Sequence, residues 1–267
     1  MGTIRRAAVA GTFYPDNPHR LREVVTGLLA AEPLMETGVD TRLVIVPHAG
    51  YIYSGAIAAG AYRLLAATPP AASRVVLLGP SHFVRFTGLA APGVDAVETP
   101  LGLIEVDTAL VASAAGHSVV VAEPAAHARE HSLEVQLPFL QVALGEFSAL
   151  PLATGDIMAE TAAVVLDDLL EDPGALGVIS SDLSHYLDDA TARRRDVATA
   201  QAIVELRPED ITPDDACGHT AVQAALLVAR KRGWSCQQLA LGNSSDTEGP
   251  RKRVVGYGAF VLGPRFE

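Results

Sequence analysis

Short apolar runs that stop at a proline or a glycine most constrain how this chain can fold. The run Leu43–Val46 stops at Pro47, and the run 75–78 stops at a Gly-Pro pair. Proline has no backbone N–H to donate to a neighbouring strand, so each stop marks the end of a strand. Apolar runs without polar alternation are typical of strands buried on both faces. A histidine follows each stop, at His48 and at His82, which places both beyond the end of a buried strand.

Helical patterns separate these runs from further strands. Apolar residues at helical spacing between Leu21 and Leu29 predict a helix. Ser54 predicts the N-cap of a second helix over 55–67, which the pair Pro69-Pro70 is expected to end. Further helices are expected over 107–115, 130–144, 157–170, 189–206 and 217–231, and further strands over 118–122, 147–153, 176–180, 239–241 and 254–262. The stretch 83–102 has no strong period and is expected to form a loop or hairpin across the mouth of the sheet.

The alternation of strands and helices predicts the fold class. Strands that alternate with helices indicate an α/β fold, with a central, mostly parallel or mixed sheet covered by helices on both faces. The chain has no repeat of fixed period, no low-complexity tract and no Gly/Ser-rich or Pro-rich linker. A chain of 267 residues is long enough to bury one large core. We therefore expect one domain, 1–267.

Composition excludes several classes of partner. The formal net charge of −11 argues against a nucleic-acid surface, which needs clustered Lys and Arg. No apolar stretch approaches the length of a membrane span, and the first residues do not have the pattern expected of a signal peptide. Two cysteines, Cys217 and Cys236, are too few for a disulfide framework, so a reducing compartment is expected. The sequence thus predicts a cytoplasmic protein that binds neither nucleic acid nor membrane.

Side chains able to bind a metal or a proton follow the predicted strands or begin predicted helices. They are His48, His82, the group Glu130, His131 and Glu134, and the pair Asp182 and His185. Each segment alone has a plain structural explanation, such as a helix N-cap for Asp182. Together they predict a site, because the carboxyl ends of parallel strands meet at one edge of a sheet. A carboxylate and an imidazole three residues apart share a helical face, where they can form a general acid/base pair or a metal ligand with its orienting group.

The remaining histidines and cysteines have weaker signals. His19, His117 and His127 lie in polar or turn-like surroundings and are expected at the surface. Cys236 is expected to pack as a small hydrophobic residue. Cys217 follows an acidic turn and begins a predicted helix, where the helix dipole is expected to lower the thiol pKa and favour the thiolate.

Several long motifs, in order along the chain, resemble those of the Memo family, which in prokaryotes is also called AmmeMemoRadiSam system protein B. The motifs are RRAAVAGTFYP at 5–15, PHAGYIYSG at 47–55, GPSH at 79–82, EHSLEVQLPF at 130–139, SSDLSHY at 180–186, ACG at 216–218, GNSSDT at 242–247 and VGYGA at 255–259. The resemblance therefore covers nearly the whole chain.

The resemblance implies a fold similar to that of the class III, LigB-like extradiol ring-cleavage dioxygenases. Those enzymes use a non-haem iron(II) held by two histidines and a carboxylate. In this sequence the corresponding metal-site residues are His48, His82 and Cys217, with Asp182, His185 and His131 in the same pocket. A thiolate in place of the carboxylate makes such a site softer, so that it suits copper or zinc as well as iron.

The residues and the resemblance together predict a metal-dependent, oxidoreductase-like protein, with iron(II) as the first choice of metal. His185 is the expected acid/base, Asp182 its orienting group, and His131 a group that steers substrate or oxygen. One alternative is a non-catalytic scaffold that binds a peptide or partner in an enzyme-like pocket. Another is a hydrolase that uses zinc-bound water or the Cys217 thiolate. The prokaryotic family name further implies a radical SAM enzyme as a partner.

Overall fold

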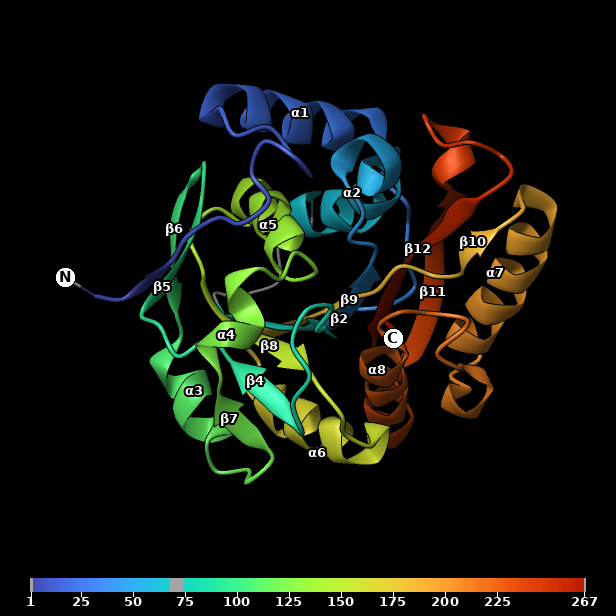
Figure 1. Ribbon diagram of the computed structural model, residues 1–267. Coiled ribbons are helices and arrows are strands. Elements are labelled where there is room, and N and C mark those ends of the chain that lie inside the picture. Colours follow the sequence, from blue (N-terminus) through green and yellow to red (C-terminus); the bar gives the residue numbers. More distant parts are fainter. Residues whose placement is uncertain (1, 68–73, 267) are drawn as a thin grey trace.

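Helices surround one large mixed sheet in the computed structural model, which describes residues 2–67 and 74–266 (Figure 1). The strands are β1 (Ile4–Arg5), β2 (Leu43–Val46), β3 (Arg74–Pro80), β4 (Leu89–Ala91), β5 (Ala96–Thr99), β6 (Gly102–Val106), β7 (Val120–Ala122), β8 (Ser148–Thr154), β9 (Ala175–Ser180), β10 (His185–Leu187), β11 (Ser235–Asn243) and β12 (Val254–Gly263). The proline pair at positions 69 and 70, predicted to end a helix, lies outside the described residues.

The α-helices and 3₁₀-helices connect these strands. The α-helices are α1 (Pro18–Ala31), α2 (Tyr51–Ala67), α3 (Thr108–Ala114), α4 (Pro124–Ala128), α5 (Leu137–Ala143), α6 (Ala159–Leu169), α7 (Asp189–Val204) and α8 (His219–Arg232), and the 3₁₀-helices are η1 (Glu134–Gln136), η2 (Pro208–Asp210) and η3 (Ser244–Asp246). Within the described ranges, no helix combines the length and the apolar character that crossing a membrane requires.

The four central strands run parallel and end at the same edge. The order across the sheet is β1-β5-β6-β8-β3-β9-β2-β12-β10, with β11 beside β12 and β4 beside β8. β3 pairs in parallel with β8 and with β9, and β9 pairs in parallel with β2. Their last residues are Val46, Pro80, Thr154 and Ser180, so the loops that follow converge. β12 is antiparallel to β2, which confirms the predicted mixed sheet.

Both faces of the sheet are covered, as the sequence predicts. In β2, Leu43 and Ile45 face one core, while Val44 and Val46 face the other. One core includes residues of α3, α6, α7 and α8, and the other includes residues of α1, α2 and α5 (Figure 1). A strand buried on both sides has no polar position to alternate with, which explains the uninterrupted apolar run.

The stretch 83–102 is more ordered than predicted. It contains β4 and β5, and β6 begins at its last residue. β4 pairs with β7 and β8, and β5 pairs with β1 and β6. Strands of three or four residues are too short to show an alternation of apolar and polar residues, so the sequence does not reveal them. They form because neighbouring strands pair with them.

Two predicted helices begin elsewhere than expected. α2 begins at Tyr51, so Ser54 lies inside its first turns, where its hydroxyl donates to the carbonyl of Ala49 over 2.9 Å and does not cap the helix. The predicted helix over 130–144 is η1 followed by α5, with Pro138 in the first turn of α5, where its missing N–H is not needed. The other predicted helices and strands are present, with ends shifted by a few residues.

Candidate metal site

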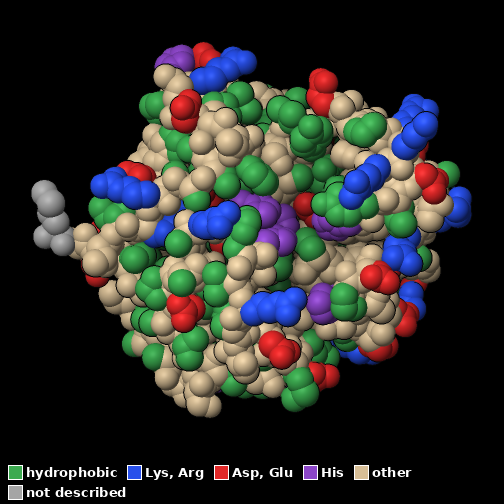
Figure 2. Space-filling view, viewed as in Figure 1, with side chains coloured by type: hydrophobic (Ala, Val, Ile, Leu, Met, Phe, Trp, Pro, Cys, Tyr) green, Lys and Arg blue, Asp and Glu red, His purple; other side chains and the backbone are tan. Residues whose placement is uncertain are grey.

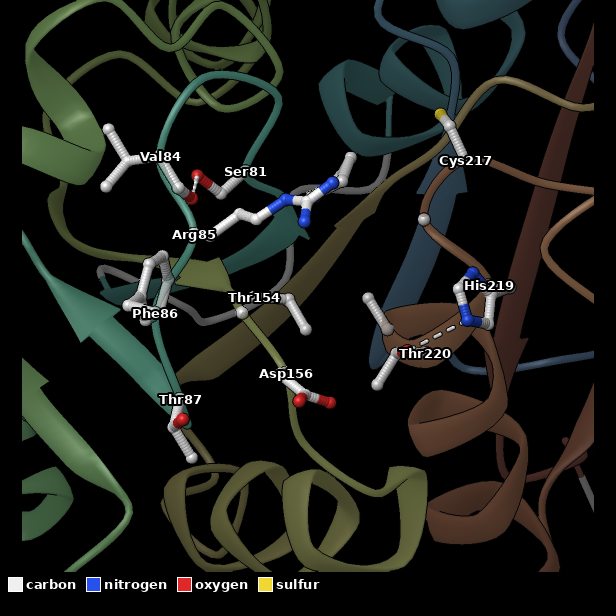
Figure 3. Close-up of a pocket in the computed structure, with 14 residues that line it drawn as sticks. Ser81, Val84, Arg85, Phe86, Thr87, Thr154, Asp156, Cys217, His219 and Thr220 are labelled. Carbon is white, nitrogen blue, oxygen red and sulfur yellow. Dashed lines mark hydrogen bonds between the residues drawn. The ribbon is translucent and has the colours of Figure 1, made fainter.

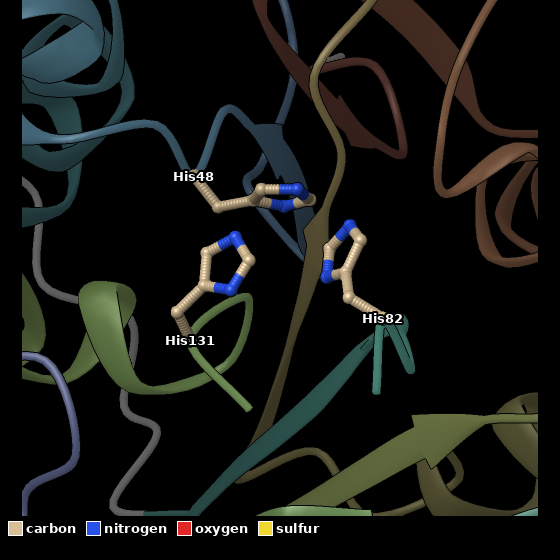
Figure 4. Close-up of side chains that lie close together, drawn as sticks. All are labelled: His48, His82 and His131. Carbon is tan, nitrogen blue, oxygen red and sulfur yellow. The ribbon is translucent and has the colours of Figure 1, made fainter. Parts of the chain in front are cut away.

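Three histidine side chains meet beyond the ends of the central strands (Figure 4). His48 follows β2, His82 follows β3, and His131 precedes η1. One ligand nitrogen from each lies within 4.8 Å of the other two. The rings of His82 and His131 stack with centroids 4.6 Å apart, and His48 presents its ring edge-on to both. The three imidazoles are therefore close enough to bind one ion.

A hydrogen-bond chain behind His48 fixes which ring nitrogen faces the site. The Ser180 hydroxyl donates to the carbonyl of Ser132 over 2.6 Å and accepts from the Gln136 amide over 2.8 Å. Its proton is thus already used, so it accepts from Nδ1 of His48, which lies 2.9 Å away. The lone pair of His48 is left on Nε2, which lies 3.3 Å from Sγ of Cys217.

The carboxylate of Glu130 fixes which ring nitrogen of His82 faces the site, and it also lies next to His131. Its carboxylate accepts from the backbone N–H of His82 over 2.6 Å and lies 2.9 Å from His82 Nδ1, so Nε2 of His82 is free. It also accepts from the backbone N–H groups of His131 and Ser132 over 2.9 Å each, and lies 3.4 Å from His131 Nδ1. Burial alone would raise the pKa of Glu130, but hydrogen bonds from His82 and Ser132 outweigh it and hold the pKa at about 2. Metal-binding histidines commonly donate their second N–H to such a carboxylate. The sequence places Glu130 in the right segment but does not predict this role.

Two of the histidines are held in the neutral form that binds metals. Burial lowers the pKa of His48 to about 3, with the neighbouring His82 as the next cause. Burial also lowers the pKa of His131 to about 4, with His48 as the next cause. Their nitrogens therefore keep their lone pairs at neutral pH.

These shifts predict that the metal-free protein loses stability as the pH falls from about 7.5 to about 5. The unfolded imidazole binds a proton near pH 6.5 and the folded one only near pH 3 to 4, so the unfolded state takes up protons first. The contribution of each histidine to the free energy of unfolding is full above about pH 7.5 and is lost as the pH falls, by about 2 kcal/mol for each histidine at pH 5. Urea unfolding across this range measures it. His131→Phe removes one titrating group, so the free energy of unfolding of this variant is expected to change less with pH than that of wild type. An equal change in the two proteins would contradict the lowered pKa of His131.

Cys217 lies beside this group, but its thiol is not activated as expected. Helix α8 begins at His219, so Cys217 precedes the helix and does not open it. Burial raises the pKa of the Cys217 thiol to about 12, with the charge of Asp182 as the next cause. The pair of Cys217 and His48 is therefore a thiol beside a neutral imidazole, which is not the ion pair of an activated cysteine nucleophile.

Asp182 and His185 line the same cavity but do not share a helical face. Asp182 follows β9 and accepts from the backbone N–H of His48 over 2.7 Å, while burial raises the pKa of its carboxyl. His185 begins β10, and the next residue, Tyr186, has a φ of 62°, so the helical turn predicted for this pair is wrong. The cavity measures ≈ 840 Å³ and is lined by the three converging histidines, Cys217, Asp182 and His185. Figure 2 shows histidine side chains gathered near the centre of this face of the molecule.

Glu134 points away from the metal site, so the predicted pairing with His131 is also wrong. Its buried carboxylate forms an ion pair with Arg5 and accepts from the hydroxyl of Tyr14 and from the backbone N–H groups at positions 8 and 9. Arg5 also donates to the carbonyl of Glu130 over 2.7 Å. The N-terminal motif therefore holds the segment that carries His131.

The other histidines and Cys236 fall mostly as predicted. His19 is exposed and His117 is partly exposed, each beside a carboxylate. His127 is not at the surface: it is 4% exposed, and its Nε2 lies 2.7 Å from the carbonyl of Ala90, because the short helix α4 packs against β4. Cys236 packs against the core from β11, as expected of a small hydrophobic residue.

Comparison with known proteins gives relatives over nearly the whole chain. A family model described as Memo-like protein matches residues 5–261. A MEMO1 family protein from Aquifex aeolicus is 35% identical over 277 residues, which cover 97% of this chain and 99% of the relative. A MEMO1 family protein from Methanosarcina acetivorans is 36% identical over 275 residues, with the same two coverages. The crystal structure of an uncharacterized protein from Escherichia coli K12 superposes with a TM-score of 0.47 at 13% identity, over 83% of this chain and 100% of that one.

Proposed function

This chain belongs to the Memo family, and we propose that it is a metal-dependent oxidoreductase whose ion is held by His48, His82 and His131. The observation that carries this proposal is the convergence of three imidazole nitrogens within 4.8 Å of one another. The orientation of the rings supports it, because His48 and His82 each use Nδ1 in a hydrogen bond that leaves the lone pair on Nε2.

Iron(II) is the metal we propose first, and copper and zinc suit the same imidazole donors. A bound iron(II) would supply redox chemistry and open coordination positions for small molecules. The protein would hold the substrate in the ≈ 840 Å³ cavity, where His185 can donate or accept a proton and Asp182 carries a buried carboxyl. Asp182 also fixes the backbone at His48 through its hydrogen bond.

Metal analysis of protein purified without oxygen tests the proposal. Wild type is expected to hold about one equivalent of metal, and His48→Ala close to none, because the most buried of the three ligands is lost. His19→Ala changes an exposed histidine on α1 and is expected to keep the full content. Equal trace metal in wild type and His48→Ala would contradict the proposal.

The third ligand is tested separately, because Cys217 is the alternative that the family resemblance suggests. With three histidine ligands, His131→Gln is expected to weaken metal binding roughly 100-fold and Cys217→Ser less than tenfold. Titration with Fe(II) or Co(II) under anaerobic conditions measures both. The reverse order would assign the third position to Cys217 and leave His131 as a neighbour of the metal.

Turnover separates the remaining functions. Oxygen-dependent conversion of a small molecule that requires bound iron supports the proposal. Stoichiometric zinc with ester or amide hydrolysis would favour a hydrolase. A partner protein that still binds the Cys217→Ser variant, without any turnover, would favour a scaffold.

Association with a radical SAM enzyme is a further proposal, and co-purification from a host that contains both proteins tests it.

A further inference from the structure

A second cavity, of ≈ 580 Å³, lies next to the ≈ 840 Å³ cavity of the metal site, and Cys217 is the one residue that lines both. Its walls are the loop after β3 (81–87), the end of β8 with the residues that follow it (154–156) and the start of α8 (Figure 3). The first two loops follow neighbouring parallel strands, where ligands of open α/β sheets bind. The proposed metal chemistry does not use this cavity.

One positive and one negative side chain line this cavity. Arg85 extends across it from the loop after β3, and Asp156 lines it from the adjoining loop after β8, which pairs with the first loop at Thr87 (Figure 3). Both side chains are exposed, and neither has a hydrogen-bond or ion-pair partner within residues 2–67 and 74–266. A guanidinium and a carboxylate that line one cavity without pairing can each take a group of opposite charge from a ligand.

Further polar groups line the cavity beside these two charges. Helix α8 has 14 residues, and its N-cap, Gly218, has no side chain to bind the N–H groups of the first turn. The N–H of His219 bonds to the carbonyl of Ala216, and residues 218–221 at the positive end of the helix line the cavity. Thr154 lines the same cavity and is 9% exposed, yet its hydroxyl has no partner among the described residues. Nδ1 of His219 is likewise buried without a partner there. Buried polar groups are nearly always hydrogen-bonded, so an unpaired cluster in a cavity points to a polar ligand.

We propose that this cavity binds a small zwitterion of the amino-acid type. Its carboxylate would lie between Arg85 and the start of α8, within reach of Thr154, and its ammonium group beside Asp156. The charges of Arg85 and Asp156 cancel, which suits a zwitterion and disfavours a phosphate dianion in a chain of net charge −11. The inference does not depend on the metal, although a ligand anchored here would reach Cys217 at the edge of the metal cavity.

Binding of four small probes to the full chain tests this inference. The probes are L-alanine, propionate, isopropylamine and inorganic phosphate, compared by saturation-transfer NMR at matched ionic strength. Alanine is expected to bind about tenfold more tightly than propionate, since only alanine also pairs with Asp156. Arg85→Gln is expected to weaken both about tenfold, whereas Asp156→Asn should reduce alanine to the level of propionate. Arg20→Gln, an exposed arginine on α1, is the matched control and is expected to match wild type.

Three results would overturn the inference: no saturable binding of alanine to wild type, unchanged binding of alanine to Arg85→Gln, or tighter binding of phosphate than of alanine. Metal content measured on the same samples keeps the two proposals apart. Arg85→Gln and Asp156→Asn are expected to hold as much metal as wild type, because neither residue lines the metal cavity. A failure of the zwitterion proposal would therefore not count against the metal site, and a failure of the metal proposal would not count against the zwitterion site.

Discussion

Glu130→Gln is expected to lower the metal affinity of this chain by roughly 10- to 100-fold while the protein stays folded. The Glu130 carboxylate accepts three backbone N–H groups, at His82, His131 and Ser132, and lies beside Nδ1 of His82. Glutamine has one acceptor oxygen, and its amide nitrogen would face an N–H donor. His82 then loses the partner that keeps its lone pair on Nε2, and His131 loses a nearby charge.

Anaerobic titration with Co(II), followed by its visible spectrum, measures this affinity without depending on turnover. Circular dichroism and thermal unfolding show whether the variant is folded. Glu146→Gln changes an exposed glutamate at the other end of the sheet and is the matched control. A folded Glu130→Gln protein with the affinity and the Co(II) spectrum of wild type would show that Glu130 does not position the ligands.

The role of Glu130 shows where sequence reasoning ends at this site. The apolar runs predict β2 and β3, and their proline stops predict that His48 and His82 lie at one sheet edge, because strand geometry alone decides this. The partner of each Nδ1 depends on contacts between distant segments: Ser180 lies 132 residues from His48, and Glu130 lies 48 residues from His82. No local spacing encodes these pairs.

The wrong predictions share this cause. The spacing of Asp182 and His185 predicts a shared helical face, but β10 pairs with β12, and that pairing sets the backbone. A cysteine near a helix start predicts a lowered thiol pKa, whereas burial beside His48, 169 residues away, raises it. His127 is predicted at the surface but is buried, because its partner is the backbone carbonyl of Ala90, and a backbone partner cannot be recognised from the sequence. Strand and helix positions follow from local patterns, but protonation states follow from tertiary burial.

The largest expected loss of stability comes from Arg5, in the N-terminal motif. Its side chain is 9% exposed, and it pairs with Glu134, whose side chain is fully buried. It also donates to the carbonyls of His127 over 3.0 Å and Glu130 over 2.7 Å. Arg5→Met removes the positive charge and leaves the carboxylate of Glu134 buried without its counter-charge, which costs about 3–5 kcal/mol when a buried pair is broken from one side.

Urea unfolding of Arg5→Met measures this loss, and the neighbouring residue supplies the control. Arg6 pairs with Glu98 at the surface, where its side chain is 72% exposed, so Arg6→Met is expected to cost less than about 1 kcal/mol. The double variant Arg5→Met with Glu134→Gln removes both charges and is expected to recover part of the loss. Equal midpoints for Arg5→Met and Arg6→Met would contradict the argument. Because Arg5 holds the Glu130 carbonyl next to His131, the folded Arg5→Met protein is also expected to bind metal more weakly, which would link the N-terminal motif to the metal site.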